Sequence, residues 1–188
     1  MKIRRIVVGL QAAPSSRAML EAAAAYAAYA QAELMGLFVE DIDLLHFAGL
    51  PFAREVGAGS AGRRALDVSA MERSLRLAAN EARAMLASVA SGAALRWSFS
   101  VKRGVVAAEL LAVADESDLL LVCSVQPSDL RGPHVQVVHA QYPHDLRAAL
   151  QSAAGAVIVA GDEARVGEAL RILLSDGRAQ DGNKRPAE

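Results

Sequence analysis

Side chains that could act as nucleophiles are scattered along the chain, and the sequence gives none of them a catalytic partner. Four serines lie at predicted turns, and the sole cysteine ends a predicted strand: Ser15, Ser16, Ser124, Ser128 and Cys123. A serine nucleophile needs a histidine and an acid to orient it, and a reactive thiolate needs a neighbouring cation or a helix N-terminus. No such arrangement can be assigned, so we predict capping and packing roles, no catalytic residue and no enzymatic activity.

Three histidines recur at intervals of five residues, at His134, His139 and His144. This spacing brings side chains together neither on a strand nor on one helix, so a shared metal ion would require a loop to gather them. No cysteine or carboxylate pattern accompanies them, and we predict surface histidines and no metal site. The acidic cluster at 40–43 could hold a cation, although a solvated loop is the simpler interpretation.

A glycine-rich hexapeptide, GAGSAG at 57–62, spells a pattern that binds phosphate when it joins a strand directly to a helix. Arg63 and Arg64 follow it and could meet an anion. The context differs from that of a phosphate site, because the preceding predicted strand ends near Val39 and a long stretch containing Pro51 intervenes. A loop or lid with solvated arginines is therefore favoured over a phosphate cradle.

Composition excludes several classes of protein. The chain has 188 residues, which is enough for one domain with a substantial core, and its formal net charge of −1 provides no attraction for nucleic acid. A single cysteine excludes an internal disulfide. No apolar run is long enough to cross a membrane, and the N-terminus enters a strand pattern without a secretory leader. We therefore expect a cytoplasmic protein that binds neither nucleic acid nor membrane.

Strand and helix patterns alternate along the chain. Short apolar or alternating runs predict five strands, at 4–10, 33–39, 95–101, 118–123 and 156–160. Helical spacing of apolar residues predicts helices at 15–31, 69–91, 105–116, 145–151 and 162–174. The segments 40–65 and 124–142 are expected to be irregular.

Alternation of this kind predicts an α/β fold, a three-layer sandwich around a five-stranded parallel sheet. We expect this domain to span 1–161, followed by an additional helix at 162–175 and a disordered tail at 176–188. Open parallel sheets bind ligands beyond the carboxyl ends of their strands. The candidate cofactor-binding or ligand-binding positions at those ends are Gln11, Val39 and Ser124.

Four stretches of the sequence resemble the universal stress protein family. They are the first strand and turn, IVVGLQAAPSS; the second strand, AELMGLFVED; the segment GVVAAELLAVADESDLLLVCS; and the last strand, AAGAVIVA. Together they cover roughly residues 3–160. The resemblance implies a Rossmann-like fold related to the adenine nucleotide alpha hydrolases, a dimer and, in one branch of the family, an ATP site.

The residues that this ATP site requires are not present. Where the family has an acidic residue, glycine and serine after the first strand, this chain has Gln11, Ala12 and Ala13. The phosphate loop of the ATP-binding branch has three glycines and a serine or threonine, and the matching positions are Cys123, Gln126, Gln136 and Val137. Glycines there let backbone N–H groups approach a phosphate closely. The resemblance therefore implies the fold without the phosphate site, and we expect no cofactor.

Two functions remain open from the sequence. The first is a non-catalytic regulatory or stress-response protein that acts as a dimer through an unknown protein partner. The second is a sensor module that binds a nucleoside or another small molecule in the cleft, with Gln11 as a neutral reader. We expect the homodimer to form by pairing of an exposed edge strand with its own copy, through Val157, Ile158 and Val159.

Overall fold

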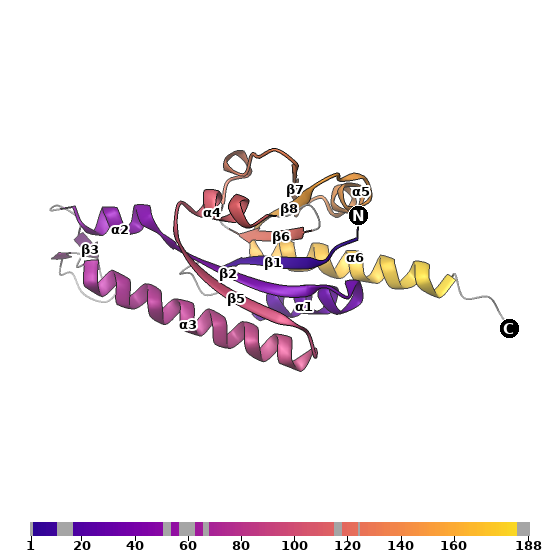
Figure 1. Cartoon of the computed structure of the whole chain (residues 1–188), viewed down its shortest axis with the longest axis horizontal. Coiled ribbons are helices and arrows are strands. Elements are labelled where there is room, and N and C mark those ends of the chain that lie inside the picture. The colour runs from indigo at the N-terminus through magenta and orange to yellow at the C-terminus, as the bar shows by residue number, and fades with distance from the viewer. Residues whose placement is uncertain are drawn as a thin grey trace.

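A six-stranded sheet forms the centre of the computed structural model, and all neighbouring strands in it are parallel. The structure describes residues 2–10, 17–50, 54–56, 63–65, 68–114, 118–123 and 125–183. The strands of the sheet are β1 (Arg5–Leu10), β2 (Glu33–Asp41), β5 (Trp97–Gly104), β6 (Asp118–Cys123), β7 (Val135–His139) and β8 (Ala156–Gly161). Their order across the sheet is β5-β2-β1-β6-β8-β7 (Figure 1).

Helices connect these strands, as the alternating pattern predicts. They are α1 (Arg17–Ala30), α2 (Ile42–Ala48), α3 (Val68–Gly92), α4 (Val106–Val113), α5 (Pro143–Ser152) and α6 (Glu163–Asn183), with a short 3₁₀ turn, η1 (Pro127–Asp129). A separate antiparallel pair is formed by β3 (Arg54–Val56) and β4 (Arg63–Ala65). The α/β class with helices flanking a parallel, Rossmann-like sheet is confirmed.

The predicted number of strands, five, is wrong, because β7 adds a sixth. This strand lies in the segment 124–142, which the sequence analysis treats as irregular. Its sequence VQVVH is short and follows a Gly-Pro pair, so local pattern gives little sign of a strand. Pairing with β8, in which Val137 lies opposite Ile158, fixes it as a strand through a contact that is distant in sequence.

The sixth strand also overturns the expected position of Val157, Ile158 and Val159. We predicted that these residues form an exposed edge, but β8 lies between β6 and β7. All three side chains are fully buried within the single chain. The edge of β8 that we expect from the sequence to pair with a second copy is therefore paired with β7 of the same chain.

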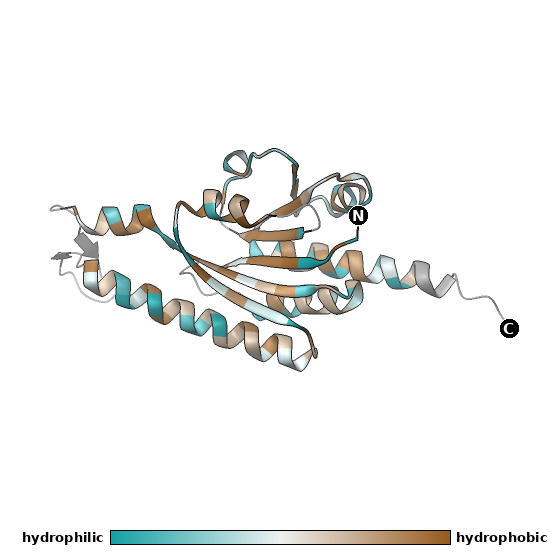
Figure 2. Cartoon of the chain, viewed as in Figure 1, coloured by the Kyte–Doolittle hydropathy of each residue, from teal (hydrophilic) through white to brown (hydrophobic). Residues whose placement is uncertain are grey.

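The two faces of the sheet are covered unequally. One apolar cluster joins the sheet to α1, α3, α5 and α6, and a second, smaller cluster joins the other face to α4 and to Leu130 near η1. Figure 1 shows α3 and α1 on one side of β2 and β5, with α4 on the other. The central strands are strongly hydrophobic, whereas α3 carries hydrophilic residues along its outer side (Figure 2).

Glycines allow helices to approach the sheet on both faces. A Cβ on Gly9 would lie 3.0 Å from a methyl carbon of Leu110 in α4. A Cβ on Gly36 would lie 2.7 Å from Leu86 in α3 and 2.8 Å from the ring of Phe99. The distances at Gly36 are shorter than real side chains show and the distance at Gly9 is tighter than most, so each glycine gives space to a neighbour that packs on it.

Two helical segments differ from the expectation. The helix α2 falls in the predicted irregular segment 40–65, and the carboxylate of Asp41 caps it by accepting a hydrogen bond from the backbone N–H of Asp43 at 2.9 Å. The helix α6 continues to Asn183 instead of ending near Leu174. Its extension is tied to α5 by an ion pair between Asp176 and Arg147, whose closest N and O atoms are 3.3 Å apart.

Candidate functional site

The carboxyl ends of the strands are the expected location of a site in this fold. Of the three predicted positions, Gln11 and Ser124 lie outside the described residues. The third, Val39, is only 3% exposed and belongs to the apolar cluster on the α4 face. Its side chain therefore contributes to the core beneath the site.

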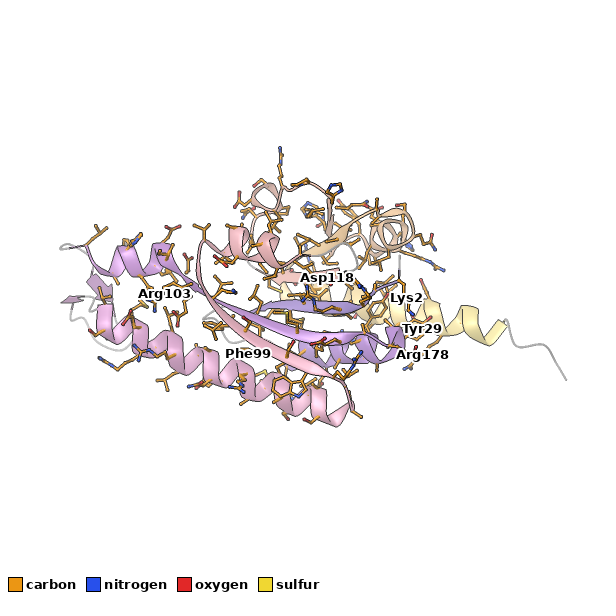
Figure 3. The ribbon with its side chains drawn as sticks, in the orientation of Figure 1. Lys2, Tyr29, Phe99, Arg103, Asp118 and Arg178 are labelled. Carbon is orange, nitrogen blue, oxygen red and sulfur yellow. The ribbon has the colours of Figure 1, made fainter. Side chains whose placement is uncertain are left out.

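An ion-pair network occupies the carboxyl ends of β2 and β5. The guanidinium of Arg103 in β5 lies 2.8 Å from the carboxylate of Glu40 in β2 and 3.3 Å from that of Glu72 in α3 (Figure 3 labels Arg103). The hydrogen bond and charge of Glu40 raise the pKa of Arg103 above its ordinary value. The acidic cluster at 40–43 is thus used for structure, since Glu40 holds Arg103 and Asp41 caps α2.

A cavity of about 360 Å³, which we call the carboxyl-end cavity, lies beside the ends of β6, β7 and β8. Its polar lining residues are Gln126, His139 and Asp162, and its apolar lining residues include Val125 and Ala160. The volume lies at the lower end of the range for ligand pockets. An amide, an imidazole and a carboxylate there can exchange hydrogen bonds with a small polar molecule.

The N-terminus of α6 opens next to this cavity, and the chain caps it with its own carboxylate. Asp162 accepts a hydrogen bond from the backbone N–H of Arg165 at 2.8 Å, and its other oxygen lies 3.1 Å from the Arg165 side chain. Glu163 adds a second negative charge in the first turn. A helix N-terminus attracts anions through its unpaired N–H groups, so a built-in carboxylate competes directly with a phosphate.

The sole cysteine, Cys123, ends β6 at the same side of the sheet and is 8% exposed. Burial raises the pKa of its thiol to about 12, and the negative charges of Glu163 and Asp162 add to this effect. At neutral pH the group is a protonated thiol and therefore a weak nucleophile. Its environment agrees with the packing role that the sequence indicates.

The three histidines lie on different elements and do not converge. His134 precedes β7, His139 ends it, and His144 is in the first turn of α5, each with an exposed side chain. Within the described ranges, no group of three histidine, cysteine or acidic side chains is arranged to hold a metal ion. The hexapeptide at 57–62 lies outside those ranges, as do the side chains of Arg63 and Arg64.

The polar lining of the carboxyl-end cavity is not among the sites that the sequence predicts. His139 reaches the cavity because β7 is a strand, and the sequence analysis does not predict that strand. Gln126 precedes η1 in the same segment, where Pro127 begins the 3₁₀ turn. Two features of the sequence point to this structure, the valines of β7 to a strand and the proline of η1 to a turn. Both are weak indications without the pairing of β7 with β8.

Two of the positions aligned above with a phosphate loop, Gln136 and Val137, are in the middle of β7 and pair with Val157 and Ile158 of β8. The backbone N–H and C=O groups of β7 that face β8 are therefore used in the hydrogen bonds between these two strands.

Comparison of the chain with protein-family models gives no match, and comparison with curated proteins gives none either. Among the described residues, no helix combines the length and the apolar character that crossing a membrane requires. The assignment of function therefore depends on the geometry of the chain itself.

Proposed function

We propose that the chain is a non-catalytic regulatory protein of the universal stress type that does not bind ATP and acts through a protein partner. The observation that carries this proposal is β7. Part of the segment that aligns with the family's phosphate loop, but lacks its glycines, forms a strand at Val135–His139, and without β7 the strand order would read β5-β2-β1-β6-β8. That order has five parallel strands with the last one at an edge, as the resemblance implies. The proposed fold is a relative of the adenine nucleotide alpha hydrolases with its phosphate loop replaced.

The charge at the carboxyl ends supports the absence of ATP binding. Asp162 and Glu163 stand at the N-terminus of α6, and Asp162 already accepts the hydrogen bond that an anion would take there. A triphosphate placed beside these carboxylates would meet like charge without a glycine loop to offset it. A cytoplasmic location and a role in stress response are parts of the same proposal.

A homodimer is also part of the proposal, with a different strand at its centre. Among the described residues, the edge strands of the sheet are β5 and β7. The β5 edge carries Lys102 and Arg103, charges of the kind that protect edges from pairing, whereas β7 contains no lysine, arginine, aspartate or glutamate. Antiparallel pairing of β7 with its own copy would give a two-fold dimer. Light scattering of Gln136→Lys against wild type tests this, because an unchanged dimer mass would exclude β7.

Thermal unfolding with nucleotides tests the proposed lack of ATP binding. Binding at a hundredfold excess over Kd would stabilise the fold by about 2.7 kcal/mol, which corresponds to a rise in Tm of roughly 5–10 °C. We expect ATP, AMP and cyclic AMP at millimolar concentration to change Tm by less than about 1 °C. A saturable rise with ATP would overturn the proposal.

A small-molecule sensor is the second candidate function, favoured by the carboxyl-end cavity. Its amide, imidazole and carboxylate suit a neutral or cationic polar ligand, such as a nucleoside without phosphate. Adenosine and cytidine should then raise Tm in wild type, and Gln126→Ala should abolish that rise. Glu168→Gln, on the exposed surface of α6, is the matched control that should retain it.

A further inference from the structure

A second cavity, which we call the amino-end cavity, lies at the opposite end of the sheet. It measures about 350 Å³, is open to solvent and is lined by the end of α1, the middle and end of α5 and the middle of α6, with Ile3 ahead of β1. Figure 3 shows Tyr29 at this end of the molecule and Arg103 at the other. The lining residues named below all belong to the described part of the chain, and neither function proposed above uses the cavity.

Apolar and aromatic side chains form the body of the amino-end cavity. Ile3, Leu150 and Leu173 line it and are buried. Tyr26 and Tyr29 line the α1 side with ring centroids 6.2 Å apart and ring planes inclined by 38°. Tyr26 is buried, whereas Tyr29 is 37% exposed at the mouth. An aromatic ring at such a separation from tyrosine rings gains tilted or offset contacts in addition to its burial.

One cation in the wall has hydrogen-bonding capacity beyond its ion pair. Nη1 of Arg147 lies 3.3 Å from Oδ2 of Asp176, and this single contact uses one of the five N–H donors of the guanidinium. The side chains are 33% and 41% exposed, so both remain accessible to a ligand. A carboxylate is the partner that the remaining N–H groups match best, because a planar guanidinium binds it in bidentate fashion.

Three further basic residues are adjacent in sequence to residues that line the cavity. Lys2 and Arg4 lie on either side of Ile3, and Arg178 follows Gly177, each with an exposed side chain. Figure 3 shows Lys2, Tyr29 and Arg178 at the same end of the molecule. Asp176 is the acid in the wall. The carboxyl-end cavity differs in having Asp162 in its wall and Glu163 next to it in sequence.

A glycine in α6 shapes the wall beside Tyr29. A Cβ on Gly177 would lie 2.5 Å from the hydroxyl oxygen of Tyr29 and 2.7 Å from its Cζ. Glycine inside a helix costs about 1 kcal/mol relative to alanine. Its presence here lets the tyrosine lie directly against the helix backbone, so substitution at this position would displace the ring.

We propose that the amino-end cavity binds a small aromatic carboxylate, with its ring beside Tyr26 and Tyr29 and its carboxylate on the guanidinium of Arg147. The volume suits a molecule of one or two rings and is small for a nucleotide. The proposal is independent of the function assigned to the carboxyl end.

A titration with a defined panel of probes tests this proposal. Benzoate, phenylacetate, indole-3-acetate and 1-naphthoate are added to isotope-labelled protein, and the amide and tyrosine ring signals are followed by NMR. We expect at least one probe to bind saturably at submillimolar to millimolar concentration, with the largest shifts at Tyr26, Tyr29 and Gly177. Absence of saturable binding across the panel, or shifts centred elsewhere, would overturn the proposal.

Matched variants then identify the groups responsible. Arg147→Gln should raise the Kd of the probe that binds at least tenfold, whereas Arg171→Gln should leave that Kd within twofold of the wild-type value. Arg171 is a suitable control because it lies on α6 in an exposed ion pair with Glu168, with N and O atoms 3.0 Å apart. The neutral amide of the same probe should bind more weakly to wild type and be insensitive to Arg147→Gln. Equal weakening by both arginine variants would contradict a specific role for Arg147.

A variant of the cavity wall provides a second readout. Gly177→Ala introduces a favourable helix residue while forcing the ring of Tyr29 to move. We expect Tm to stay level or rise while affinity for the probe falls at least threefold. Unchanged affinity in this folded variant would show that the tyrosine wall takes no part in binding.

Discussion

The cavities at the two ends of the same sheet differ in their chemistry. At the carboxyl end, the N-terminus of α6 is capped by Asp162, and Glu163 adds a second negative charge. At the amino end, Arg147 has N–H donors beyond its single contact with Asp176, and two tyrosines stand beside it. At the end where this fold usually binds ligands, the chain thus caps the helix N-terminus with its own carboxylate, whereas we propose that the other end binds a ligand. Fold alone does not locate the site, because side chains decide which end can bind.

Reactivity of Cys123 gives the largest expected effect and tests the acidic character of the carboxyl end. A pKa of about 12 leaves about one molecule in ten thousand as thiolate at pH 8, whereas an unfolded thiol with a pKa near 8.5 is roughly a quarter ionised. Modification by a chromogenic disulfide should therefore be more than a hundredfold slower in native protein than in concentrated urea.

Neutralising the acids next to Cys123 tests whether their charges contribute to its slow modification. Both carboxylates raise the pKa of the thiol, so Asp162→Asn and Glu163→Gln should lower it and speed native modification at pH 8. Glu168→Gln, farther along α6, should not change the rate. A native rate equal to that of the unfolded chain would contradict the burial of Cys123.

A buried ion pair holds the amino end of the sheet and gives the next largest effect. Asp118, which is 3% exposed, lies against the guanidinium of Arg5, whose Nη2 also donates to the carbonyl of Val113 at 2.9 Å (Figure 3 labels Asp118). Asp118→Asn removes the buried negative charge that faces the guanidinium, and we expect a loss of about 3 kcal/mol in the free energy of unfolding.

An exposed pair provides the control for that measurement. Glu21 is 56% exposed and bonds to Arg17 at 2.8 Å on the surface of α1. Glu21→Gln should change the free energy of unfolding by at most about 0.5 kcal/mol. Urea unfolding of both variants measures the two losses in the free energy of unfolding. Equal losses would show that the stability of the amino end does not depend on the ion pair of Asp118.

A strand or helix could be predicted from the sequence where its own residues carry the pattern, and could not where contacts distant in sequence determine it. Buried strands such as β6, in which every residue is buried, are indicated by continuous apolar runs, and α3 by its helical spacing. The strand β7 could not be predicted, because its five residues are fixed by pairing with β8. A second error followed from the first, because without β7 the strand that contains Ile158 is expected at the edge of the sheet.

The candidate site shows the same limit. Asp162 could be predicted as a helix cap from its place before an apolar-periodic segment, but its meeting with His139 across a cavity depends on β7. Similarly, Tyr29, Arg147 and Gly177 are far apart in sequence and come together only because α1, α5 and α6 pack on one face. No local pattern encodes that convergence.

Removing the cap of α6 gives the smallest expected effect. Asp162→Ala eliminates the hydrogen bond to the Arg165 N–H and should cost about 1 kcal/mol of stability. Glu168→Ala removes an exposed pair on the same helix and should cost at most about 0.5 kcal/mol. Thermal and urea unfolding can resolve the two values, and equal losses would show that Asp162 does not cap the helix.

One NMR experiment on a single labelled sample tests the contrast between the two ends most directly. ATP is titrated first to millimolar concentration, and then the aromatic carboxylate that binds best. We expect ATP to leave the amides of Val125, Gln126 and Gly161 unshifted, and the carboxylate to give saturable shifts at Tyr29 and Gly177. Saturable ATP shifts at the carboxyl-end cavity, with none from the carboxylates at the amino end, would contradict the account.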